Sequence, residues 1–279
     1  MTSSLPPRLR LGAVPYLAGR PCVEGLDRSP HFEVVRATPA ELIARLRDGA
    51  IDVALCSSIE GFRRPGYRYV PGICIGAERE VRSVLMFSRV PLEECTTLAL
   101  DPASRSGAAL AQIVLRGMGA PAVRAVETSP GGDPSRTGAH AYIRIGDAAL
   151  RHAAQLRSTP EVEVEVYDLA ALWRRLTGLP TVFALWLVRP GVAVTRDQIA
   201  ALRAARDLGI HNIPQIALEG ERTIGLPAAF LEGYLRDACR YDLDAPGYVE
   251  SLAEFGRRAA ELGLAEDGVA PSPVILEYS

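Results

Sequence analysis

Three short polar segments follow stretches that are typical of buried strands, and they carry residue types suited to binding an anion. These segments are Ser57-Ser58 after residues 51–56, Ser104-Arg105-Ser106 after 97–100, and Gly146-Asp147 after 141–145. The second and third also open predicted helices, whose first N–H groups and positive dipole end favour carboxylates. Serine hydroxyls and the guanidinium fork of Arg105 supply further donors. The segments predict a site for a small carboxylate, although each serine could simply cap a helix, Asp147 could be a cap, and Arg105 could lie on the surface.

The cations of the chain exclude several reaction classes. All 31 basic residues are arginine, because the sequence contains no lysine. This composition, which a GC-rich genome would explain, excludes Schiff-base, pyridoxal-phosphate and P-loop lysine chemistry. Anions must instead be bound by arginine, backbone N–H groups or hydroxyls. The net charge of -2, with both signs mixed along the chain, also excludes the usual signature of a nucleic-acid-binding protein.

The histidines and cysteines show no catalytic or metal-binding pattern. The four histidines are scattered, and none belongs to a recognisable Ser/His/Asp or Cys/His arrangement. The five cysteines are odd in number and lack metal-ligand spacing, which favours buried, reduced thiols over disulfides or zinc. The sequence therefore predicts no metal site.

The elements that must position these residues alternate between strands and helices. Strands are predicted at residues 9–16, 32–36, 51–56, 70–77, 81–88, 97–100, 123–126, 141–145, 161–166 and 181–189. Helices are predicted from Pro39 to Gly49, after Gly107 to Met118, and at 168–176, 195–208, 227–240 and 246–262. Thr38 and Glu41 form a capping-box pattern at the first helix. Strand–helix–strand order favours an α/β protein with parallel strands.

The order of elements predicts two lobes with a ligand cleft between them. The tail after residue 195 reads as helical throughout, so we expect it to pack on the first sheet. This gives a discontinuous first lobe, 1–89 plus 190–279, and a second lobe, 90–189, with crossings near Ser88 and Arg189. The cleft should receive the carboxyl ends of strands and the amino ends of helices. Ser83 is added to the candidate site because it lies on a strand that is predicted to cross to the second lobe. Alternatively, it could be a serine buried in a strand with no contact to a ligand.

The amino-terminal residues and the hydropathy of the chain indicate the cellular compartment of the protein. The first ten residues are polar and lack the apolar core of a signal peptide. The richest apolar run, 182–188, has the length of a strand rather than a membrane span. These features predict a soluble, cytoplasmic protein that takes a small-molecule substrate, with no membrane partner and an oligomeric state that the sequence does not give.

Several stretches together resemble one known family. They are AVPYLAGRP (13–21), DVALCSSIE (52–60), PGICIG (71–76), VRSVLMFS (81–88), LDPASRS (100–106), IGDAALR (145–151) and residues 167–186. In order and number they resemble the chorismate dehydratases of the futalosine route to menaquinone, over about residues 9–190. The resemblance implies a type II periplasmic-binding-protein-like fold in a cytoplasmic enzyme. It also implies cofactor-free conversion of chorismate to 3-[(1-carboxyvinyl)oxy]benzoate and water.

The chain departs from that family at one position. Where the family reads Ser-Tyr-Leu-Asn, this sequence reads Pro15-Tyr16-Leu17-Ala18. In the family, the asparagine is thought to lie at the substrate and to help the elimination by positioning or proton transfer, which alanine cannot do. Ala18 could be an engineered Asn→Ala substitution, or natural drift with lost or altered activity. Alternatively, the enolpyruvyl carboxylate of the substrate acts as the base and the asparagine only orients it.

Two other functions remain open at this point. One is a non-catalytic binding protein for a small carboxylate on the same fold. The other is the related naphthoate synthase of the same pathway, which uses a histidine base that has no counterpart in this sequence. The predicted binding residues are Ser58, Ser83, Ser104, Arg105, Ser106, Gly146 and Asp147, with Ala18 marking the altered catalytic position.

Overall fold

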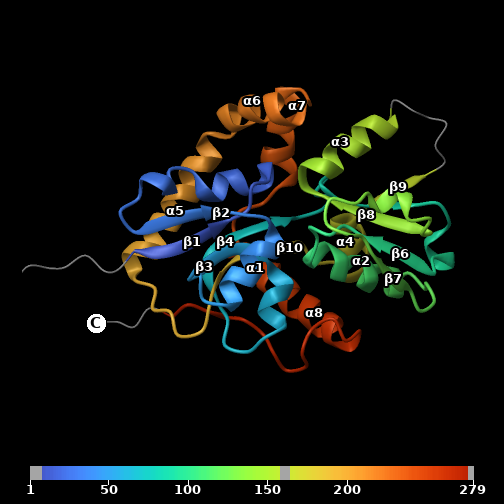
Figure 1. The fold of residues 1–279 in the computed structure, drawn as a ribbon, viewed down its shortest axis with the longest axis horizontal. Helices are drawn as coiled ribbons and strands as arrows, with labels where there is room; N and C mark the ends of the chain where they lie inside the picture. Colours follow the sequence, from blue (N-terminus) through green and yellow to red (C-terminus); the bar gives the residue numbers. More distant parts are fainter. Residues whose placement is uncertain (1–7, 158–163, 276–279) are drawn as a thin grey trace, which may run out of the picture.

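Apolar strands build two separate β-sheets in the computed structural model, which describes residues 8–157 and 164–275 (Figure 1). The first sheet has the order β11-β4-β10-β3-β1-β2 and the second has the order β7-β6-β8-β5-β9. The strands of the first sheet are β1 (Leu9–Ala13), β2 (Phe32–Arg36), β3 (Val53–Ser57), β4 (Arg68–Ala77), β10 (Thr181–Val188) and β11 (Ser272–Pro273). Those of the second are β5 (Val84–Ser88), β6 (Thr97–Leu100), β7 (Arg124–Glu127), β8 (Ala141–Ile145) and β9 (Glu165–Asp168).

Both sheets mix parallel and antiparallel pairs. β1 runs parallel to β2 and β3, and β6 runs parallel to β7 and β8, as the alternating pattern predicts. β10 runs antiparallel to β3 and β4, and β5 runs antiparallel to β8 and β9. β10 is a central strand, buried along most of its length, which explains its continuous apolar sequence.

Eight α-helices cover the sheets in the described ranges. They are α1 (Pro39–Arg47), α2 (Ser106–Gly117), α3 (Gly146–Arg157), α4 (Leu169–Thr177), α5 (Arg196–His211), α6 (Ile213–Ile224), α7 (Ala228–Gly233) and α8 (Tyr248–Glu261). The predicted capping box is confirmed: the Thr38 hydroxyl accepts a hydrogen bond from the Glu41 N–H, and the Glu41 carboxylate accepts one from the Thr38 N–H. No helix of the described part is long and apolar enough to span a bilayer.

The sheets divide the chain differently from the predicted lobe boundaries. β5 belongs to the second sheet and β10 to the first, so the crossings lie at residues 78–83 and 178–180 rather than near Ser88 and Arg189. The prediction assigned each strand to the other lobe because apolar content does not reveal which strands pair. In addition, part of the predicted strand 161–166 lies outside the described residues.

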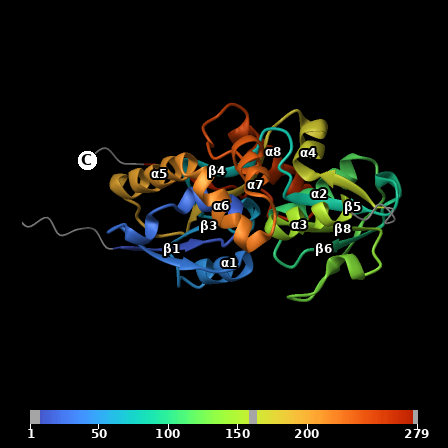
Figure 2. The ribbon, with the colours of Figure 1, turned by 90° about the horizontal axis from the view of Figure 1, so that it is seen from above.

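The carboxy-terminal tail differs from the prediction in two ways. It contains an additional helix, α6, and the short strand β11, which pairs with β4. As expected, α5 packs on the first sheet, at β4. The tail also reaches the second lobe, where α8 packs against α2 (Figure 2). Trp173 of α4 donates a hydrogen bond to Ser251 of α8 at 2.9 Å. The tail therefore contacts both lobes.

One half-buried carboxylate fixes the first crossing. Asp168 Oδ2 accepts hydrogen bonds from the N–H groups of Val81 and Arg82, at 3.0 and 2.6 Å. Its other oxygen caps α4. Arg82 has a φ of 63°, in the left-handed region that non-glycine residues seldom adopt. The Asp168 contacts hold this conformation and set the direction in which the next residue, Ser83, enters the second sheet.

Asp52 joins three strands of the first sheet and gives a prediction about stability. Its carboxylate accepts bonds from the backbone and side chain of Arg10 and from the side chain of Arg189. Burial alone would raise the pKa of Asp52, but these bonds outweigh it and hold the pKa at about 2. Because the folded pKa lies below the unfolded value, the stabilisation is present above about pH 4 and is lost as pH falls toward about 2.

We therefore expect Asp52→Asn to lower the free energy of unfolding by about 2 kcal/mol at pH 7. The difference between the two proteins should shrink as the pH approaches 2. Urea unfolding followed by circular dichroism at several pH values measures it. Asp207→Asn, which changes an exposed carboxylate on α5, is the control and should have little effect. If the loss in unfolding free energy caused by Asp52→Asn stays constant with pH, the low pKa assigned to Asp52 in the folded protein is wrong.

Candidate functional site

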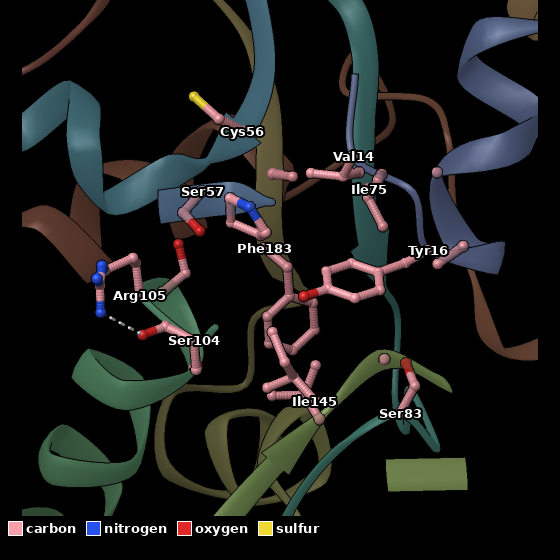
Figure 3. Close-up of a pocket in the computed structure, with 18 of the residues that line it drawn as sticks. Val14, Tyr16, Cys56, Ser57, Ile75, Ser83, Ser104, Arg105, Ile145 and Phe183 are labelled. Atoms are coloured by element: carbon pink, nitrogen blue, oxygen red, sulfur yellow. Dashed lines mark hydrogen bonds between the residues drawn. The ribbon is translucent and has the colours of Figure 1, made fainter. Parts of the chain in front are cut away.

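A pocket that is partly open to solvent lies between the two sheets (Figure 3). It is lined by Val14, Tyr16, Ala18, Gly19, Pro39, Cys56, Ser57, Ile75, Val81, Ser83, Val84, Ser104, Arg105, Ser106, Gly107, Ile145, Gly146, Phe183 and Ala184. Apolar walls and a few hydroxyls make it suited to a ligand that has both a ring and polar groups.

The start of α2 brings two serine hydroxyls to the pocket. Ser104 is 2% exposed, and its Oγ has no hydrogen-bond partner among the described residues. A Cβ on Gly107 would lie 2.6 Å from this oxygen, so glycine makes room for it. The Ser106 hydroxyl accepts a bond from the Ile59 N–H at 3.2 Å. A buried hydroxyl without a partner is costly, so the Ser104 hydroxyl is available to a polar group of a ligand or to a water molecule.

Arg105 supplies the charge of the pocket lining. Its guanidinium makes only a long hydrogen bond, 3.4 Å, to the Ser104 carbonyl, and it forms no ion pair within residues 8–157 and 164–275. Burial lowers the pKa of the neighbouring Arg63, and repulsion from Arg105 and Arg47 lowers it further, against the attraction of Glu60. Arg47 is neutralised by its ion pair with Glu60, and neither Arg47 nor Arg63 lines the pocket, so Arg105 is the charged group that an anion in the pocket would meet.

Tyr16 projects into the pocket from the segment after β1, with its ring directed toward Phe183 (Figure 3). Burial raises the pKa of Tyr16 to about 12, with a further increase from the carboxylates of Asp101 and Asp147. The hydroxyl is therefore protonated at neutral pH and can donate a hydrogen bond. Gly146, at a φ of 59°, lies under the ring, and a Cβ there would be 3.1 Å from it. Glycine at position 146 thus lets Tyr16 lie against the start of α3.

Two predicted binding residues join the lobes instead of lining the pocket. Ser58 is fully buried, donates to the Val182 carbonyl at 2.8 Å and lies 3.1 Å from the Ser106 hydroxyl. Asp147 accepts a bond from the Leu17 N–H at 3.1 Å. Burial raises the pKa of Asp147, although this hydrogen bond lowers it. These contacts hold the two lobes together on either side of the pocket.

The other predicted positions do line the pocket, and the prediction missed some neighbours. Ala18, Ser83, Ser104, Arg105, Ser106 and Gly146 belong to the lining. Ser57 lines it in place of Ser58, because β3 extends one residue beyond the predicted strand and Ser58 begins the next turn. Tyr16 and Phe183 were not among the predicted binding residues, and both line the pocket.

Comparisons with known proteins relate the chain to one family. The profile of a family described as menaquinone biosynthesis matches residues 9–261. A chorismate dehydratase from Thermus thermophilus is 30% identical over 249 residues, which cover 83% of this chain and 91% of that protein. A chorismate dehydratase from Campylobacter jejuni is 30% identical over 169 residues, which cover 61% of this chain and 58% of that protein.

Solved structures show the fold. A protein from Archaeoglobus fulgidus gives a TM-score of 0.70 at 14% identity, covering 92% of this chain and 98% of its own. The periplasmic aliphatic sulphonate binding protein SsuA from Escherichia coli gives 0.67 at 18% identity, covering 99% and 95%. These similarities confirm the predicted periplasmic-binding-protein-like fold.

Proposed function

The chain belongs to the menaquinone biosynthesis family, and from this premise we propose that it dehydrates chorismate to 3-[(1-carboxyvinyl)oxy]benzoate. In this reaction a proton leaves C3, the hydroxyl leaves C4 as water, and the ring becomes aromatic. Aromatisation supplies the driving force. The protein mainly has to hold the two carboxylates and align the leaving groups.

One observation carries the proposal: the buried Ser104 hydroxyl, which has no hydrogen-bond partner among the described residues, and the guanidinium of Arg105 both line the pocket between the lobes. Together they offer a carboxylate one hydroxyl donor and one charged fork. The hydroxyls of Ser57, Ser83 and Tyr16 come from other parts of the lining and are available for the second carboxylate and the C4 hydroxyl. The apolar side chains of Val14, Ile75 and Phe183 provide walls for the ring.

The pocket lining offers few groups that could take the C3 proton. Arginine keeps its proton, and Tyr16, with a pKa of about 12, is a donor at neutral pH. None of the lining residues is a histidine or a carboxylate. We therefore propose that the enolpyruvyl carboxylate of chorismate is the base. An asparagine at position 18, as the resembling family has, would orient this carboxylate. Ala18 then leaves that carboxylate without its orienting amide, whether the alanine is engineered or natural.

Incubation of the pure protein with chorismate tests this function. We expect the diene absorbance of chorismate to fall, slowly for the chain with Ala18, and the product to appear by NMR as a substituted benzoate. Binding of chorismate with no turnover, also after Ala18→Asn, would instead support a binding protein for small carboxylates.

We also propose that the reaction belongs to the futalosine route and takes place in the cytoplasm. All five cysteines are buried free thiols, which agrees with a reducing compartment.

A further inference from the structure

Ser83 is held from three directions at the edge of the pocket. It is 3% exposed, and its carbonyl accepts a hydrogen bond from the Gly146 N–H at 2.7 Å. The preceding residue, Arg82, is fixed by Asp168. The Ser83 hydroxyl accepts a bond from the hydroxyl of Tyr234 at 2.8 Å. Both the backbone and the side chain of Ser83 therefore have one defined position.

Tyr234 reaches Ser83 from the carboxy-terminal tail, 151 residues away in the sequence. It is the first residue of a π-helical turn, Tyr234–Ala238, which the hydrogen bond from the Cys239 N–H to the Tyr234 carbonyl closes at 3.1 Å. Such widened turns are frequent at functional sites. The tyrosine side chain is fully buried, and burial raises the pKa of its hydroxyl well above the ordinary value. The hydroxyl therefore remains a donor.

The direction of this hydrogen bond determines what Ser83 can offer a ligand. A serine hydroxyl has one hydrogen and two lone pairs. The Tyr234 proton occupies a lone pair of the Ser83 oxygen, so the hydrogen of Ser83 must point elsewhere. Because Ser83 lines the pocket, its hydrogen is free to point toward a bound ligand. Without Tyr234 the hydroxyl could rotate and turn a lone pair toward the ligand, which would repel a carboxylate.

We propose that Tyr234 is a positioning residue that makes the Ser83 hydroxyl a dedicated hydrogen-bond donor to a substrate carboxylate. The inference rests on the proposed function, which supplies the carboxylate. It adds a residue of the tail, outside the pocket lining, to the residues that determine affinity.

A double-mutant cycle on the full chain tests the proposal. Tyr234→Phe removes only the phenolic hydroxyl, and Ser83→Ala removes its acceptor. We expect each single substitution to weaken chorismate binding, measured by calorimetry, by about tenfold, the effect of one hydrogen bond to a charged group. In the Ser83→Ala background, Tyr234→Phe should have no further effect on the Kd, because its target is gone.

Tyr248→Phe is the matched control. Tyr248 is also a buried tail tyrosine, 4% exposed, but its hydroxyl has no hydrogen-bond partner in the described part of the chain and does not line the pocket. It should leave the Kd unchanged, and thermal unfolding of all variants shows that each one folds. Unchanged affinity in Tyr234→Phe, or additive losses in the double variant, would overturn the positioning role.

The two proposals can fail separately. If the unsubstituted chain binds and dehydrates chorismate but the cycle shows no coupling, the role of Tyr234 is wrong and the proposed function stands. If the chain neither binds nor dehydrates chorismate, the proposed function is wrong, and the cycle is run with benzoate as the carboxylate probe. Coupling toward benzoate would support the positioning role for another carboxylate, and an absence of benzoate binding or of coupling would overturn it.

Discussion

Replacing Ala18 with asparagine is expected to raise kcat for chorismate dehydration by about 100-fold or more, the usual range for a group that assists proton transfer. Ala18 lines the pocket from the 3₁₀ helix Leu17–Val23, which follows Tyr16, so a longer side chain there reaches the ligand space. The amide would orient the substrate carboxylate that takes the C3 proton. Steady-state kinetics on both proteins, with chorismate loss followed by absorbance, measures the change.

Ala18→Leu separates the chemistry of the amide from its volume. Leucine has about the size of asparagine but no hydrogen-bonding group, so it should give no increase in kcat. Equal turnover in the unsubstituted chain and in the Ala18→Asn variant would show that position 18 has no part in catalysis. In that case the substrate carboxylate is oriented by the serines of the pocket alone.

Replacing Arg105 with glutamine is expected to raise the KM for chorismate by about 100-fold, since a charged, bidentate contact to a carboxylate is lost. The kcat should change less, because the bond is made in the ground state as well as in the transition state. Arg105 is suited to this role because it carries the charge of the pocket lining and has no ion-pair partner in the described chain. Kinetics at two salt concentrations measures the effect.

Arg116→Gln is the control for Arg105. Arg116 lies at the exposed end of the same helix, α2, so its loss changes the net charge by the same amount but leaves the pocket intact. Its KM should stay close to that of the unsubstituted chain. If Arg105→Gln also binds chorismate normally, the carboxylates are held by hydroxyls and backbone N–H groups, and Arg105 does not bind the substrate.

Local signals in the sequence predicted most of the fold. The capping box at Thr38 and the apolar run of β10 each depend on neighbouring residues, and both elements formed as expected. Strand pairing depends on residues far apart in the sequence. For this reason the lobes were divided one strand too late at each crossing, and α6 and β11 were not anticipated.

The candidate site was predictable where it follows the ends of strands. Ser104, Arg105, Ser106 and Gly146 were found by that rule, and all four line the pocket. The choice between Ser57 and Ser58 depended on a single residue of strand length, which sequence patterns do not resolve. Tyr234 could not be found in this way, because its contact with Ser83 joins the tail to the first crossing and leaves no local pattern.

The path of the chain through the two sheets also has a consequence for its synthesis on the ribosome. The strands of the second sheet all come from residues 84–168, so this sheet can form while the tail is still being made. The first sheet has to wait, because β10 lies between β3 and β4. Until residues 181–188 emerge, β3 and β4 each present an unpaired edge, the kind of surface that chaperones protect and that aggregation exploits.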